Sequence, residues 1–182
     1  MTDPTPGFNT TAGQQIARET LIAYLNTGTS QSPTWSALGK YVTDSSMSYD
    51  WGDSAEKDIL GNTNVTMKAP VITQTFEPLN LDSADSAIVK IWELAVRDQN
   101  PQALCAQDVL VAHFYYSPDT ASPTTGWAER YPSSMVKPTG LGGEGGGSIE
   151  MPVEITYGGA RVKGSVTRGS GGTVTFTAAS GS

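Results

Sequence analysis

One stretch of the chain, residues 82–99, has the apolar spacing of an amphipathic helix more clearly than any other. Asp82 or Ser83 is expected to cap its first turn, and Asn100 with Pro101 is expected to end it. A chain of 182 residues with one such helix has to build the rest of its core from strands. This constraint points to a mainly β fold.

The remaining apolar segments are short and are separated by turn residues. The 20 glycines and 11 prolines of the chain suit strands joined by turns. The segments 19–26 and 107–117 are apolar on both faces, which predicts burial on both sides or burial against another chain. Pro132 predicts an edge strand or a bulged strand. Strands are expected over residues 19–26, 40–49, 65–76, 107–117, 127–137, 148–158, 160–168 and 173–178.

These elements predict a β-sandwich or partial barrel in a single domain over residues 19–180. Residues 1–18 are polar and contain prolines and glycines, so they are expected to form a flexible N-terminal arm. A long loop is expected at about residues 50–64, because the connection exceeds the usual length of about two to five residues for a hairpin loop. An exposed tryptophan on such a loop, Trp51, is typical of an anchor in a partner.

The charge of the chain limits its partners. A formal net charge of −7 argues against tight binding to duplex nucleic acid, whose phosphates need neutralising cations. No run of about 18 apolar residues occurs, so no membrane span is expected. The polar N-terminus lacks the basic and then apolar plan of a signal peptide, which favours a protein made and kept in a cytoplasm.

No group of residues has the pattern of a catalytic, cofactor or metal site. The single histidine, His113, lies in an apolar segment and is expected to be a core or interface residue. The single cysteine, Cys105, is expected to be a packed thiol, and no intrachain disulfide can form. The acids of residues 44–58 do not match a calcium loop. Glu150 and Glu154 fit the solvent face of an alternating strand better than a glycosidase pair. We therefore expect no enzyme.

The segment from Trp35 to Pro78 resembles the major tail proteins that build the tubes of long-tailed bacteriophages. The resemblance rests on the sequences WSALG, DSSMSYDW, EKDILG and TFEP. The order of elements also fits, with sandwich strands, a long loop, one amphipathic helix and further strands. The pattern covers roughly residues 19–116.

The resemblance implies a structural protein that assembles from copies of itself. Six subunits would form a ring, and rings would stack head to tail into a tail tube, a contact that does not close on itself. Exposed strand edges would then be the means of assembly. DNA would pass through the negative channel without specific binding. The tape measure, terminator and distal tail proteins would be further partners, and the protein would reside in a virion tail assembled in the bacterial cytoplasm.

The uneven distribution of charge suggests how rings could meet. Residues 44–58 hold five acids and one base, whereas residues 155–182 hold three bases and no acid. We predict that the acidic loop of one ring contacts the basic segment of the next. The predicted interface residues are Asp50, Trp51, Asp53, Glu56 and Asp58 on one side and Arg161, Lys163 and Arg168 on the other.

Two alternatives remain open at the level of sequence. Trp35, Trp51 and Trp127 could be stacking platforms of a carbohydrate-binding or adhesive β-sandwich. A small-ligand barrel or an isomerase-like enzyme with an unrecognised site is the second alternative.

Overall fold

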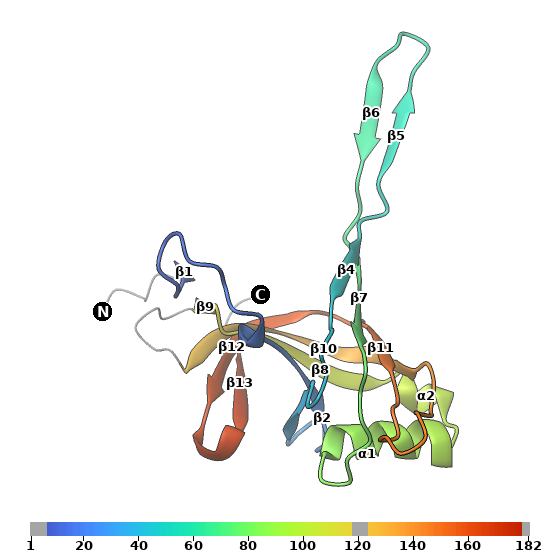
Figure 1. Cartoon of the computed structure of the whole chain (residues 1–182). Helices are drawn as coiled ribbons and strands as arrows, with labels where there is room; N and C mark the ends of the chain where they lie inside the picture. The colour runs from blue at the N-terminus through green and yellow to red at the C-terminus, as the bar shows by residue number, and fades with distance from the viewer. Residues whose placement is uncertain (1–6, 118–123, 180–182) are drawn as a thin grey trace.

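The computed structural model describes residues 7–117 and 124–179, and it is mainly β, as predicted (Figure 1). The strands in chain order are β1 (Gly7–Phe8), β2 (Leu21–Asn26), β3 (Trp35–Leu38), β4 (Met47–Asp50), β5 (Ser54–Lys57), β6 (Thr63–Thr66), β7 (Val71–Phe76), β8 (Gln107–His113), β9 (Tyr116–Ser117), β10 (Thr125–Pro138), β11 (Val153–Thr156), β12 (Val162–Arg168) and β13 (Val174–Ala178). The main helices are α1 (Ser86–Trp92) and α2 (Pro101–Leu104).

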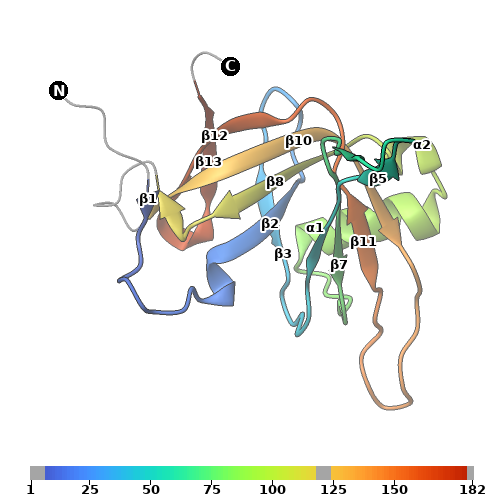
Figure 2. The ribbon, with the colours of Figure 1, turned by 90° about the horizontal axis from the view of Figure 1, so that it is seen from above.

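The large sheet is organised around the long strand β10. Its strands follow the order β3-β2-β8-β10-β11-β7-β4, and β12 joins β10 to β13 (Figure 2). The first part of β10 lies between β8 and β12, and its last four residues pair with β11. The register shifts between Tyr131 and Ser134, so Pro132 sits in a bulge as predicted. Within the described residues the strand order has free ends at β3, β4 and β13, which makes the sheet a partial barrel.

Strands β2 and β8 bury side chains on both faces, which confirms the prediction from their two-sided apolar pattern. On one face, Leu25 and Val109 join the larger core cluster beneath α1. On the other face, Tyr24 and Leu110 join a second cluster that β12 and β13 help to cover. The apolar residues of these strands therefore contribute alternately to one core cluster and to the other.

The predicted helix is present, but its cap differs from the prediction. Asp85 is the N-cap residue, and its carboxylate accepts hydrogen bonds from the backbone N–H groups of Ala87 and Ile88. Asp82 instead forms an ion pair with Lys40. Helix α1 buries Ile88 against the larger core cluster and continues as a π-helical segment, η2 (Glu93–Arg97).

The helix ends where the sequence predicted. Asn100 then caps the short helix α2, and Pro101 occupies its first turn.

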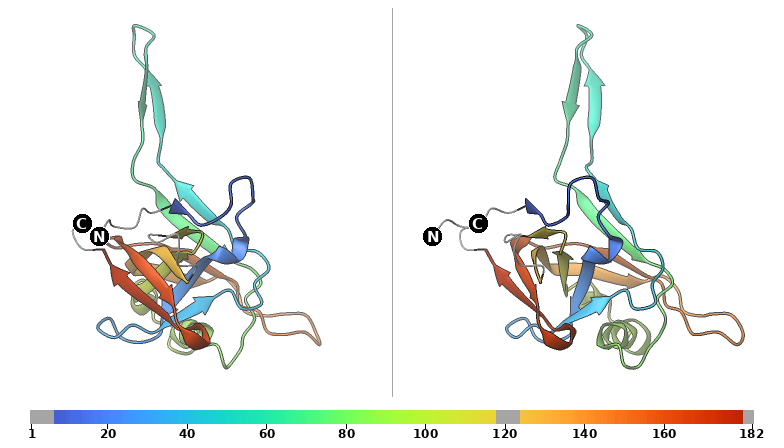
Figure 3. Two further views of the ribbon diagram at one scale, coloured as in Figure 1. Left: turned by 90° about the vertical axis from the view of Figure 1, so that its left-hand side faces the viewer. Right: turned by 60° about the vertical axis from the view of Figure 1, so that its left-hand side comes forward.

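Residues 50–64 do not form an irregular loop. Strands β5 and β6 pair with each other as a separate two-stranded sheet, which extends the β4–β7 pair into a long hairpin that projects from the body (Figures 1 and 3). The prediction of a long connection at this place holds, but short strands occupy much of it.

Several strand boundaries also differ from the predictions. Strand β3 was not predicted, and the predicted strand 40–49 begins only at Met47. Tyr41 has a φ of 63°, a left-handed conformation that does not fit a strand. The predicted strand 148–158 is regular only over Val153–Thr156.

The predicted N-terminal arm lies partly outside the described residues, which begin at residue 7. Strand β1 pairs with β9, and a single 3₁₀ turn, η1 (Arg18–Thr20), leads into β2. Among the described residues, no helix is long and apolar enough to cross a membrane.

Candidate assembly surfaces

The projecting hairpin carries apolar side chains in full contact with solvent. Ile59 and Leu60 at its tip are 102% and 81% exposed, and Val65 and Met67 on the returning arm are also exposed. Soluble chains rarely leave several large apolar side chains together in water unless a partner covers them. The tip is therefore a candidate contact surface.

The turn at the tip is ordered by its own residues. One carboxylate oxygen of Asp58 accepts the backbone N–H groups of Leu60 and Asn62, each at 2.9 Å. The other accepts the side-chain amide of Asn62 at 3.0 Å. The bond from the Asn62 side chain is the main reason why the pKa of Asp58 lies below its ordinary value. Gly61 has a φ of 83°, which favours glycine at this position.

The predicted interface acids all lie on this hairpin. Asp50 ends β4, Asp53 precedes β5, Glu56 lies within β5 and Asp58 begins the turn. None of the ion pairs found in residues 7–117 and 124–179 includes any of these four acids. Their charges are therefore available to a partner.

Trp51 lies at the base of the hairpin. It is 44% exposed and stacks on Tyr49, with ring centroids 6.3 Å apart. A half-exposed tryptophan held by a neighbouring ring suits an anchoring role in an interface.

The three predicted interface bases lie in three different environments. Arg161 is paired with Glu129 at 2.8 Å, and Glu129 is itself buried. The guanidinium group of Arg168 lies 3.8 Å from the centre of the Phe114 ring. Lys163 is exposed on β12. Lys163 is therefore the base of this group whose substitution disturbs the fold least.

The single histidine is a core residue, as predicted. His113 is 6% exposed, its Nδ1 lies 2.7 Å from the Tyr115 hydroxyl and its Nε2 lies 3.3 Å from Glu129. Cys105 differs from its prediction because it is exposed at the end of α2, outside both core clusters. No group of three potential metal-binding side chains occurs in the part of the chain that the structure describes.

The three tryptophans considered as sugar platforms lie in different settings. Trp35 is buried in the second core cluster beneath the guanidinium group of Arg130. Trp127 packs against His113, with ring centroids 4.8 Å apart. Only Trp51 is exposed among these three, so they do not form a shared aromatic surface.

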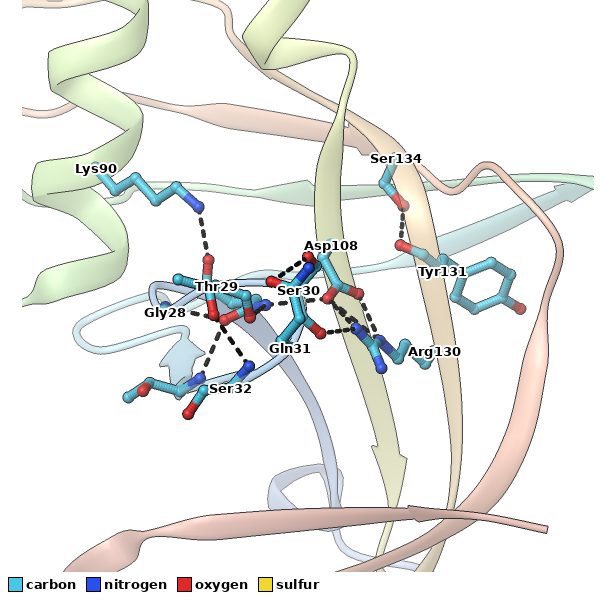
Figure 4. A network of polar contacts seen from close by, with 12 residues as sticks. Gly28, Thr29, Ser30, Gln31, Ser32, Lys90, Asp108, Arg130, Tyr131 and Ser134 are labelled. Carbon is cyan, nitrogen blue, oxygen red and sulfur yellow. Dashed lines mark hydrogen bonds and ion pairs between the residues drawn. The ribbon is translucent and has the colours of Figure 1, made fainter. Parts of the chain in front are cut away.

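A second projecting connection, the β2–β3 loop at residues 27–34, is tied to the body by a polar network (Figure 4). The buried side chain of Asn26 is one half of this network. Its oxygen accepts the backbone N–H groups of Gly28 and Thr34 at 2.9 and 3.0 Å. Its nitrogen donates to the carbonyl oxygen of Thr29 and to Asp108, each at 3.0 Å.

The other half of the network is the ion pair of Asp108 and Arg130. Arg130 contacts the two carboxylate oxygens of Asp108 at 2.9 and 2.7 Å, and it also donates to the carbonyl oxygen of Ser30 (Figure 4). The bond to Asp108 raises the pKa of Arg130. Lys90 of α1 donates to the Asn26 carbonyl oxygen at 2.6 Å, and its partial burial lowers its pKa. The loop is thus held by neighbouring strands and by the helix.

A groove of about 680 Å³ opens between the β2–β3 pair, strand β7 and the start of α1. We call it the β2–β7 groove. Its apolar wall consists mainly of Leu21, Ala23, Leu38, Val42 and Phe76.

Charged residues also line the β2–β7 groove. They are Arg18 and Glu19 of η1, Lys40 after β3 and Asp85 at the start of α1. No motif in the sequence pointed to this groove, because its walls come from four segments that are far apart along the chain.

The similarity to known proteins is structural. No protein-family model matches the chain. No curated protein matches it either. A chain in the cryo-EM structure of the PVC sheath/tube terminator of an extracellular contractile injection system, in its extended state, is similar with a TM-score of 0.52 and 8% sequence identity. The match covers 84% of this chain and 99% of that chain.

Two further solved structures are similar at lower scores. A chain of the PVC sheath-tube complex has a TM-score of 0.47 and 8% identity, over 84% of this chain and 93% of that one. A chain of the tube-terminating cap of the anti-feeding prophage has a TM-score of 0.47 and 12% identity, over 93% and 95%. The match to the terminator chain shows that this protein shares its fold with a chain of an extracellular contractile injection system.

Proposed function

We propose that this chain is a non-enzymatic structural subunit of a phage-tail-like tube and that it assembles with copies of itself. The observation that carries the proposal is the fold shared with a chain of a sheath/tube terminator, over nearly the whole length of that chain. Because one fold can serve many functions, a feature of this chain that suits assembly is also needed. The exposed hairpin, with its apolar tip and unpaired acids, is such a feature.

The open edges of the sheet support the same proposal. Strands β3 and β4 end the main strand order of the described residues, and β13 ends the branch through β12. Unpaired strand edges attract further strands, and monomeric proteins usually protect them. In a ring of subunits, the edge of one sheet can pair with the sheet of a neighbour.

The specific arrangement we propose is a ring of six copies, with rings stacked head to tail into a tail tube. Tape measure, terminator and distal tail proteins would be the other partners, and the assembled particle would be a virion tail. DNA would pass through the channel without specific binding, because the net charge of −7 on every copy repels phosphates.

Electron microscopy of negatively stained protein at increasing concentration tests this proposal directly. We expect rings or striated tubes, together with a fast-sedimenting species in analytical ultracentrifugation. Single rings without tubes would assign a terminator-like role in place of a tube subunit. A chain that remains monomeric at the highest soluble concentration contradicts the proposal.

Charge reversal tests the proposed contact between the acidic hairpin and the basic segment. Lys163→Glu, alone and with Arg168→Glu, should reduce tube yield at low salt, because an attractive charge becomes repulsive. The single variant carries the argument, since Arg168 also contacts Phe114 in the core. Normal tube yield from Lys163→Glu removes this contact from the proposal.

A further inference from the structure

We propose that the β2–β7 groove receives the hairpin tip of a second copy of this chain. This inference rests on the proposed self-assembly and adds the surface to which the tip binds. The tip is the segment Lys57-Asp58-Ile59-Leu60, and the groove is the one described above.

The apolar groups of the two surfaces match. Ile59 and Leu60 stand next to each other with nearly all of their surface in water. The groove offers an apolar wall that includes the half-buried Leu21 and Val42. Its volume of about 680 Å³ falls within the range of roughly 300–1,000 Å³ that is usual for binding clefts. Two aliphatic side chains leave water when they enter such a site, which favours association.

The placement of the two surfaces excludes a contact within one chain. The hairpin projects away from the body (Figures 1 and 3). The groove lies in the body and is lined by residues that include the start of α1. A tip that binds a groove on another copy uses two different surfaces. Such a contact repeats from copy to copy, and it leads to an open stack when the rotation between copies does not close the series into a ring.

The charges at the two surfaces are complementary. Arg18 donates to the carbonyl oxygens of Leu21 and Ser45, and it takes part in none of the ion pairs of the described residues. Its neighbour Glu19 is exposed and also lines the groove. The tip likewise carries one base, Lys57, next to one acid, Asp58. Each of these two charges can therefore meet an opposite charge at the groove of the other copy.

Cross-linking between two single-cysteine variants tests the contact. Both variants carry Cys105→Ser, because Cys105 is exposed. One has Leu60→Cys at the tip, and the other has Ala37→Cys, an exposed position that lines the groove. Equal amounts are mixed, allowed to assemble and treated with a short bismaleimide. We expect a cross-linked pair in the mixture and none in either variant alone. The matched control replaces Ala37→Cys with Leu141→Cys, an exposed position on a different loop, and should link several times less.

The outcomes separate the groove from the general proposal of assembly. Rings or tubes that link Leu60→Cys to Leu141→Cys as well as to Ala37→Cys, or that do not link Ala37→Cys, overturn the groove and leave self-assembly standing. A parent chain that forms no assembly in the electron microscope overturns both.

A second variant measures the apolar part of the contact. Leu60→Asp should raise the protein concentration needed for assembly by roughly tenfold or more, since a buried leucine contributes at least that factor to an association constant. Leu141→Asp is the control, because Leu141 is exposed on a different loop. Equal effects of the two substitutions contradict the proposal.

Discussion

The β2–β3 loop and the β5–β6 hairpin both leave the sheet, and they are stabilised in opposite ways. The loop is bound to Asn26 and Arg130, and Asp108 on the strand between theirs holds both of these side chains. The hydrogen bonds of the described hairpin residues join hairpin residues to each other, as in the turn at Asp58. One connection is bonded to the body, whereas the other exposes its apolar tip to solvent.

This difference predicts that substitutions in the loop and substitutions at the hairpin tip affect different properties of the protein. A substitution in the network of the loop should weaken the fold of a single chain, because it leaves buried polar groups without partners. A substitution at the hairpin tip should leave the single chain unchanged and act only on association. The following experiments measure the unfolding free energy in urea, under conditions in which the chain is monomeric.

The largest effect is expected for Asp108→Ala. The substitution removes the carboxylate that holds Arg130 and the Asn26 side chain, and it should lower the unfolding free energy by about 2–3 kcal/mol. The control is Glu93→Ala, which removes one acid of an exposed ion pair with Arg97 and should cost less than about 0.5 kcal/mol. Equal losses in the two variants would mean that the network does not hold the loop.

A smaller loss is expected for Asn26→Ala. The backbone N–H groups of Gly28 and Thr34 lose their acceptor, while Asp108 keeps Arg130, so the loss should be about 1–2 kcal/mol. Asn64→Ala on the exposed strand β6 is the matched control and should change the value little. Amide hydrogen exchange of residues 27–34 should rise in the first variant only.

Very little change is expected for the double variant Ile59→Ser and Leu60→Ser. Both side chains are already in water in the single chain, so the unfolding free energy should change by no more than about 0.5 kcal/mol. Assembly in the electron microscope should be lost in the same preparation. A loss of monomer stability as large as that of Asp108→Ala would show that the tip packs on its own body.

The smallest expected effect is the pH dependence of the turn at Asp58. The pKa of Asp58 is depressed below its ordinary value of 3.8, so the folded turn favours the ionised carboxylate. Its contribution is complete above the ordinary pKa and is lost as the pH falls through the lower pKa of the folded state. Amide exchange at Leu60 and Asn62 should therefore quicken at low pH, and Asp58→Asn should show faster exchange already at neutral pH. Exchange that stays independent of pH, after correction for the intrinsic rate, would contradict this role.

The sequence predicted those parts of the fold that depend on local pattern. The two-sided apolar pattern of β2 and β8 predicted burial, which the structure shows on both faces, and Pro132 predicted an edge or bulged strand, which is bulged in β10. It failed where a contact with a distant segment decides the conformation. Strand β3 is paired with β2, and Asp82 forms an ion pair with Lys40 instead of capping the helix.

The candidate surfaces were predicted in part. The acidic composition and Trp51 marked residues 50–64 as a contact segment, and the structure places this segment on a projecting hairpin. The environments of Arg161 and Arg168 could not be read from charge alone, because Glu129 and Phe114 reach them only in the folded chain. The β2–β7 groove likewise exists only once four distant segments meet.

By itself the sequence determined the mainly β composition, the single amphipathic helix and the strands with two buried faces, because periodicity acts over a few residues. The tertiary structure alone decided the groove, the network around Asp108 and the projection of the hairpin. These features depend on pairs such as Asn26 and Asp108, which are 82 residues apart and meet only when the sheet closes around them. The exposed apolar tip results from the same cause, since no segment within residues 7–117 and 124–179 covers it.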